Sequence, residues 1–212
     1  MNIHSMTGDE GRLRFVSWIT AMATHDMKNV LAIINENAGL LQDLCLLAER
    51  GTLSPDRLAD TNVRIRDQVR RGDVLLRNLN ELAHSQDQEA MGTDIGQAAE
   101  LAVALVRRMT ASFQAEVMIE KDSSEPSMTV RKFDLLRLLA ACLMAGGQHV
   151  GKGGVVRIQV TAAPVGYRIT CPVSAAEDAD ICRLARECGA ALHWDGGSLS
   201  ISLTPAIVRG VQ

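Results

Sequence analysis

The stretch Thr24-His25-Asp26-Met27-Lys28-Asn29-Val30-Leu31 decides how the first part of this chain folds. It lies within a long segment in which apolar residues recur with the period of a helix. Asp26 points into the middle of the apolar sector, His25 lies at its edge, and Asn29 follows one turn later on His25's side. The stretch therefore predicts an amphipathic helix that brings His25 and Asn29 together. The apolar sector consists of Phe15, Ile19, Met22, Val30, Ile33, Ile34, Leu40, Leu41 and Leu44.

A histidine in this position is expected to be half exposed and suited to chemistry. Histidine changes charge near neutral pH, and its neutral form is a nucleophile towards phosphorus. The carboxylate of Asp26 is placed to orient the imidazole or take its proton, and the amide of Asn29 is placed to position an attacking water. His25, as phosphoacceptor, Asp26 and Asn29 are therefore the candidate catalytic residues. Taken alone, His25 is also compatible with an ordinary surface histidine of a bundle helix.

The composition of the chain limits the class of protein. Its 212 residues, 47% of them hydrophobic, leave room for one or two domains with proper cores. The net charge of -3 and the pI near 6.0 do not suggest a nucleic-acid binder. No apolar run approaches the roughly 18 residues that a membrane span requires, and the N-terminus does not resemble a signal peptide. We therefore expect a cytoplasmic protein that binds neither nucleic acid nor membrane.

The cysteines do not predict a metal site. They show neither paired CxxC spacing nor an accompanying histidine pattern, so a zinc site is not expected. We expect the cysteines to be small, buried hydrophobic side chains. The five are Cys45, Cys142, Cys171, Cys182 and Cys188.

Residues 1–88 are expected to form a helical hairpin. Helical periodicity runs from about residue 9 to 50 and resumes from about 55 to 87, with Ser54 as N-cap and Pro55 in the first helical position. The second segment has a heptad seam that two helices do not enclose, so the hairpin is expected to pair with a second copy in a four-helix bundle. A partner within the remaining chain is the alternative. The seam consists of Leu58, Asn62, Ile65, Val69, Gly72, Leu76, Leu79 and Ala83.

Six arginines also gather on the second helical segment, interleaved with four aspartates. Mixed charges of this kind usually form a solvated face, and the alternative is a docking surface for an acidic partner. They are Arg57, Arg64, Arg66, Arg70, Arg71 and Arg77, with Asp56, Asp60, Asp67 and Asp73.

Residues 93–212 show alternating helical and strand patterns and predict an α/β sandwich with a mixed sheet and helices on one face. The overall class is therefore α+β. Thr93 is expected to cap the first helix, and Gly151-Lys152-Gly153-Gly154 is expected to be a turn before a hairpin. The expected helices cover residues 94–112, 132–149 and 177–188, and the expected strands cover 115–120, 128–130, 155–162, 166–173, 191–194 and 199–203.

This order of parts resembles that of sensor histidine kinases over nearly the whole chain. In that family a histidine-bearing dimerisation hairpin precedes a GHKL-type ATPase domain, and the histidine motif reads His, acid, two variable residues, Asn or Thr, then Pro-Leu. Here it reads His25-Asp26-Met27-Lys28-Asn29-Val30-Leu31, so only the proline is missing, and Val30 predicts a helix without the usual kink. The resemblance implies that His25 is the phosphoacceptor, Asp26 its acid/base neighbour and Asn29 a candidate for positioning water.

The second half of the chain differs from the family at the positions that bind the nucleotide and its metal ion. The family's metal-binding asparagines fall on Ala141 and Ala145, and the Asp-x-Gly-x-Gly segment is replaced by Pro172-Val173-Ser174-Ala175-Ala176. The glycine-rich lid is also absent, so a phosphate cradle has no evident source. We infer an ATPase-like fold that has lost ATP binding and uses no cofactor of its own.

A protein that keeps the histidine and loses ATP requires another phosphoryl donor. The resemblance therefore favours a homodimeric histidine phosphotransferase of a phosphorelay, with receiver domains of response regulators as partners that supply both the aspartyl phosphate and Mg²⁺. The alternatives are a receiver phosphatase or regulatory pseudokinase, in which Asn29 directs water, and a non-enzymatic dimeric adaptor. An ATP-dependent kinase is not expected.

Overall fold

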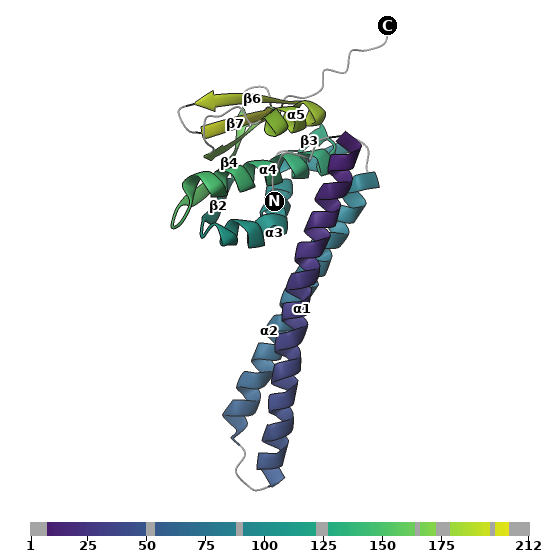
Figure 1. The fold of residues 1–212 in the computed structure, drawn as a ribbon, viewed down its shortest axis with the longest axis vertical. Coiled ribbons are helices and arrows are strands. Elements are labelled where there is room, and N and C mark those ends of the chain that lie inside the picture. The colour runs from purple at the N-terminus through teal and green to yellow at the C-terminus, as the bar shows by residue number, and fades with distance from the viewer. Residues whose placement is uncertain are drawn as a thin grey trace. The chain divides into compact units, whose positions relative to one another are not determined.

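The computed structural model describes residues 8–49, 54–87, 91–121, 127–163, 166–172, 179–195 and 198–203. It begins with two long helices, α1 (Gly8–Glu49) and α2 (Pro55–Asp87), followed by a mixed set of helices and strands (Figure 1). Contacts divide the chain into two compact units. One is Thr20–Glu81, and the other combines Met1–Ile19 with Leu82–Gln212.

The unit Thr20–Glu81 is a helical hairpin. α1 continues unbroken through Val30, as expected where the family's proline is missing, and Val30 is buried. Two buried polar residues of the hairpin form hydrogen bonds within their own helices. Asn37 Nδ2 donates to the carbonyl of Ile33 at 2.7 Å, and Thr61 Oγ1 donates to the carbonyl of Arg57 at 2.8 Å. These polar side chains can therefore face the neighbouring helix without leaving a donor unpaired.

Gly72 fixes the register of the hairpin. A Cβ atom at Gly72 would lie 3.5 Å from Val30 Cγ1 and 3.7 Å from Met27 Sδ. The glycine of α2 thus lies level with the turn of α1 that follows His25. Gly72, a member of the predicted heptad seam, is therefore a point of close approach between the two helices.

The other unit contains a five-stranded sheet and three helices. The sheet has the order β2-β4-β5-β7-β6, in which β2 and β4 are parallel and the other neighbours antiparallel, while β1 and β3 form a separate antiparallel pair. The expected α+β class and mixed sheet are confirmed. The elements are β1 (Met91–Asp94), α3 (Ile95–Ser112), β2 (Glu116–Lys121), β3 (Ser127–Val130), α4 (Lys132–Val150), β4 (Val155–Ala163), β5 (Gly166–Pro172), α5 (Ala179–Cys188), β6 (Ala190–Asp195) and β7 (Ser198–Leu203).

The core of this unit lies between one face of the sheet and the helices. Alternate side chains of the strands are buried, with Val156, Ile158 and Val160 on β4 and Leu199, Ile201 and Leu203 on β7. α4 is almost entirely buried from Phe133 to Met144. Phe133 packs edge-on against Phe15 of α1, with ring centroids 5.9 Å apart. The first turns of α1 therefore belong to the same packed core as α4.

The start of α3 differs from the sequence prediction. Asp94, rather than Thr93, is the N-cap, and its carboxylate accepts a hydrogen bond from Gln97 N at 2.9 Å. Thr93 lies in β1, a strand that the periodicity did not reveal, and its hydroxyl donates to the carbonyl of Val130 at 3.1 Å. The physical reason is that β1 pairs with β3, so Thr93 is held in extended backbone and the next polar residue caps the helix.

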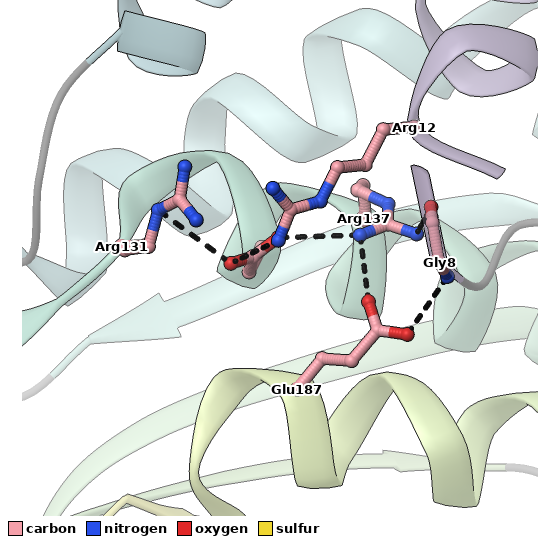
Figure 2. Close-up of polar contacts among 6 residues, drawn as sticks. Gly8, Arg12, Arg131, Arg137 and Glu187 are labelled. Atoms are coloured by element: carbon pink, nitrogen blue, oxygen red, sulfur yellow. Dashed lines mark hydrogen bonds and ion pairs between the residues drawn. The ribbon is translucent and has the colours of Figure 1, made fainter. Parts of the chain in front are cut away.

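A buried polar cluster joins α1, α4 and α5, and Figure 2 shows Arg137 and Glu187 beside Gly8 at the start of α1. Arg137 is fully buried and lies 3.2 Å from Asp134 and 2.9 Å from Glu187. Asp134 also pairs with Arg12 at 3.2 Å, and Glu187 accepts a hydrogen bond from Gly8 N at 2.9 Å. The guanidinium of Arg137 also lies 5.9 Å from the centroid of the Phe133 ring.

These contacts bear on the predicted domain boundaries, 1–88 and 93–212. The division near residue 90 stays a prediction, but the start of α1 and the end of α2, from Leu82, group with the sheet by their contacts. A chemical reason is the polar cluster, which pairs the first residues of α1 with charged groups of α4 and α5.

α1 bears on the expectation that no apolar run is long enough to cross a membrane. α1 contains an 18-residue window with a mean hydropathy of 1.3, long and apolar enough to cross a membrane by length and composition. A single such helix is weak evidence for a membrane span, because core helices meet the same test.

The expectation that the cysteines are buried holds for only some of them, since Cys142 is buried, Cys182 and Cys188 are half-buried and Cys45 is exposed. The side chain of Cys171 lies outside the described part of the chain.

Candidate functional site

The predicted contact between His25 and Asn29 is present in the hairpin. Asn29 Nδ2 lies 3.2 Å from His25 Nδ1, one helical turn away. The imidazole is 54% exposed, as its place at the edge of the apolar sector predicts. A large part of the ring is therefore open to a partner.

The carboxylate of Asp26 also lies near His25 Nδ1, the ring nitrogen that Asn29 contacts. Its Oδ1 is 3.7 Å from His25 Nδ1, which is within the range of an ion pair and longer than a good hydrogen bond. The Asp26 side chain is only 21% exposed, in keeping with its predicted place in the middle of the apolar sector. The structure thus brings all three candidate residues together at Nδ1.

The amide of Asn29 suits either tautomer of the imidazole. With its NH₂ group towards the ring it donates to an unprotonated Nδ1, and turned over it accepts a proton from Nδ1–H through its carbonyl oxygen. Asp26 favours the second arrangement, because a carboxylate attracts a ring proton or an imidazolium charge. In that tautomer the lone pair resides on Nε2, which is then the nucleophilic nitrogen.

A groove lies along the hairpin beyond this site. It has a volume of about 730 Å³ and runs between α1 and α2, where Gln68 Oε1 is buried with no hydrogen-bond partner within the described residues. Its lining includes Ile33, Glu36, Leu40 and Asp43 of α1 with Arg64, Asp67 and Gln68 of α2. Sequence periodicity alone did not reveal this groove, since it depends on how the two helices face each other.

The groove and the histidine share one side of the hairpin. Glu36 follows Asn29 by seven residues and Ile33 follows it by four, spacings that place side chains on the same side of a helix. We call this the His25 side, defined by His25, Asn29, Ile33 and Glu36. A partner bound in the groove would therefore lie on the same side of the hairpin as the imidazole.

The opposite side of the hairpin exposes apolar residues. Leu31 is two residues beyond Asn29, about 200° further round α1, and is 58% exposed. On α2, Val69 and Leu76 are 47% and 57% exposed and lie seven residues apart on one side. We call Leu31, Val69 and Leu76 the apolar side. Two members of the heptad seam, Val69 and Leu76, are therefore left exposed by the part of the chain that the structure describes.

The six arginines of α2 are exposed, as expected for a solvated face. Arg70 pairs with Asp67 at 3.0 Å, an ion pair in which both side chains are more than half exposed. Such pairs contribute little to stability, so the arginines remain available to a partner.

The sheet unit offers little for a nucleotide at the positions that the resemblance singled out. Ala141 is fully buried in α4 and Ala145 is half-buried, and neither side chain carries a donor or acceptor. Residues 173–178, which stand in place of the glycine-rich segments, lie outside the described part of the chain. Among the residues that the structure describes, no group of three or more His, Cys, Asp or Glu side chains is placed to hold a metal ion.

No family model and no curated protein matches this chain. Solved structures similar to it include a bacterial phosphotransferase, with 16% identity, a TM-score of 0.49 and coverage of 90% of this chain and 95% of that chain. The catalytic domain of histidine kinase ThkA has 13% identity and a TM-score of 0.47, covering 56% of this chain and 96% of that one. The cytoplasmic segment of histidine kinase QseC has 14% identity and a TM-score of 0.46, covering 66% and 92%.

Likenesses at these identities and TM-scores assign neither an activity nor a ligand to this chain. They concern the arrangement of helices and strands.

Proposed function

We propose that this chain is a dimeric histidine phosphotransferase of a two-component phosphorelay. His25 accepts a phosphoryl group from the aspartate of one receiver domain and passes it to another response regulator, without binding ATP. The observation that carries the proposal is the half-exposed imidazole whose Nδ1 is held between Asp26 and Asn29. Receiver domains are cytoplasmic partners, so the proposal includes a cytoplasmic location.

The chemistry follows from that geometry. The lone pair on Nε2 attacks phosphorus, the bond from phosphorus to the aspartyl oxygen breaks, and its electron pair remains on the receiver's carboxylate. Asp26 stabilises the proton on Nδ1 and the positive charge that the ring gains. The receiver supplies the phosphoryl group and Mg²⁺, so this chain contributes the nucleophile and its orientation.

The groove on the His25 side is the proposed docking surface for the receiver domain. It begins at Ile33, one turn beyond Asn29 on the same side of α1, and combines apolar residues such as Leu40 with the charged groups of Glu36 and Arg64. A bound receiver would thereby be held with its aspartyl phosphate near Nε2.

Substitution of Leu40 tests this docking surface. Leu40→Arg should raise the receiver concentration needed for half-maximal transfer. Leu46→Arg is the control and should not raise it, because Leu46 is exposed and lies outside the groove lining.

Labelled receiver domains and labelled ATP test the proposal directly. We expect the wild-type protein to acquire label from a phosphorylated receiver and not from ATP, and His25→Ala to acquire none while remaining a dimer. His149→Ala is the matched control, because His149 is also exposed but lies in α4. Label acquired from ATP, or transfer that persists in His25→Ala, would contradict the proposal.

A receiver phosphatase is the second candidate, and the position of Asn29 favours it. An amide 3.2 Å from the imidazole and open to solvent can also orient a water molecule towards a docked aspartyl phosphate. In that case receiver label would disappear without appearing on this chain, and Asn29→Ala would slow the loss more than His25→Ala. If the protein binds receivers but neither acquires nor removes label, it is an adaptor.

A further inference from the structure

We propose that Arg71 of α2 binds the phosphoryl group during its transfer to and from His25, which rests on the proposed phosphotransferase function. The heptad and charge patterns of the sequence grouped this arginine with five others on the same helix. The structure distinguishes it from them by its level along the hairpin and by the side that it occupies.

The level follows from Gly72. A Cβ at Gly72 would touch Val30 and Met27, at 3.5 Å and 3.7 Å. Arg71 is the adjacent residue and therefore leaves α2 at the level of the turn that holds Asn29. Arg57 and Arg64 lie two to four turns nearer the start of α2, beside the later part of α1.

The side follows from the groove. Arg64 and Asp67 line the groove on α2, and Arg71 follows them by seven and four residues, so it lies on the same side of its helix. On α1 the groove lining begins at Ile33, and Asn29 precedes Ile33 and Glu36 by four and seven residues, so Asn29 lies on the groove's side of α1. Arg71 therefore occupies the His25 side of the hairpin, across from the turn between His25 and Asn29.

The charge of Arg71 is available for a ligand. Among the ion pairs of the described residues of α1 and α2 none includes Arg71, and Asp67, one turn before it, pairs with Arg70 at 3.0 Å. Its side chain is exposed. Lys28, three residues after His25, places a second cation on the other side of the imidazole. The two cations thus flank the position at which a phosphoryl group on His25 would lie.

An arginine suits this role on chemical grounds. Its guanidinium offers paired N–H donors to two oxygens of one phosphoryl group, and it keeps its charge at every physiological pH. During transfer the N–P bond forms as the P–O bond breaks, and negative charge stays on the phosphoryl oxygens throughout. A donor held on α2 would stabilise that charge in both directions of transfer.

Phosphoramidate allows a test that needs no receiver. It donates its phosphoryl group to histidine as the P–N bond breaks and ammonia leaves, so labelled phosphoramidate reports on His25 and Arg71 alone. The variants are Arg71→Gln, the conservative Arg71→Lys, and the matched control Arg66→Gln, which removes the same charge from an exposed position that does not line the groove. His25→Ala measures labelling at other sites.

We expect Arg71→Gln to lower the rate of His25 labelling about tenfold, the usual effect of losing a charge-assisted hydrogen bond. Arg71→Lys should recover part of the rate, and Arg66→Gln should match the wild type, with equal melting temperatures in all. Equal rates in Arg71→Gln and Arg66→Gln, or no labelling of His25 in the wild type, would overturn the proposal. Labelling by phosphoramidate without transfer from any receiver would count against the phosphotransferase function alone.

Discussion

At the scale of single residues, Cys188 and Cys45 lie in contrasting surroundings. Burial, and secondly the nearby carboxylate of Asp134, raises the pKa of the Cys188 thiol to about 12. The thiolate is the reactive form, so Cys188 should react with iodoacetamide at pH 8 much more slowly than exposed Cys45. Mass spectrometry after timed alkylation checks the order. Early modification of Cys188 in the folded protein would contradict its burial.

The glycines allow a second prediction at this scale. A Cβ atom at Gly39 of α1 would meet nothing within 4 Å, whereas a Cβ at Gly147 would lie 2.8 Å from Phe113 Cδ2. Gly39→Ala should therefore stabilise the protein by about 0.5–1 kcal/mol through helix propensity. Gly147→Ala should destabilise it by about 1–3 kcal/mol, because the Phe113 ring must move. Urea unfolding midpoints of the two variants should shift in opposite directions.

At the scale of elements, the buried cluster of Figure 2 holds three helices together. Asp134→Ala removes a carboxylate that pairs with Arg137 and Arg12, and leaves the fully buried guanidinium of Arg137 with Glu187. Breaking one partner of a buried pair costs about 3–5 kcal/mol, so we expect a loss of about 3 kcal/mol or more in the free energy of unfolding. Thermal and urea unfolding measure it.

The control for that prediction is Glu10→Ala. Glu10 pairs with Arg14 in the same unit, but both side chains are at least half exposed. An exposed pair contributes less than about 1 kcal/mol, so this variant should unfold close to the wild type. Equal losses in Glu10→Ala and Asp134→Ala would show that the cluster is no more stabilising than a surface pair.

The elements themselves were largely predictable because their signals are local. The helix from Pro55 to Asp87 has a proline in its first turn and a periodic apolar face, and the sequence predicted its bounds. β1 was not predicted, since four residues with a glycine carry no strand pattern and depend on pairing with β3. The Asp94 cap had a signal that was missed, because Asp94 and Gln97 stand three residues apart before an apolar run.

The same distinction between local and distant contacts applies to the candidate site. His25, Asp26 and Asn29 lie within one turn of one helix, so their spacing alone predicted that they meet. The groove, Arg71 and the cluster around Arg137 each combine residues from different helices. Their positions follow from packing between helices, which periodicity does not specify.

At the scale of the whole molecule, the hairpin has two sides with different chemistry. The His25 side carries the imidazole, the groove and Arg71, while the apolar side exposes Leu31, Val69 and Leu76. A contiguous exposed apolar surface on a helical hairpin usually packs on another helix pair. We propose that a second copy of this chain covers the apolar side, in a four-helix bundle that leaves both histidines accessible to receivers.

The oligomeric state of substituted proteins tests this arrangement. Leu76→Asp places a charge on the apolar side and should raise the dissociation constant of the dimer about tenfold or more, because burying a leucine contributes about 1.5–3 kcal/mol. Val63→Asp is the control, since Val63 is 56% exposed but lies six residues before Val69, about 240° away round α2. Sedimentation equilibrium should therefore show a weakened dimer for Leu76→Asp and an unchanged one for Val63→Asp. A monomeric wild type, or equal weakening by both substitutions, would exclude the apolar side as the dimer contact.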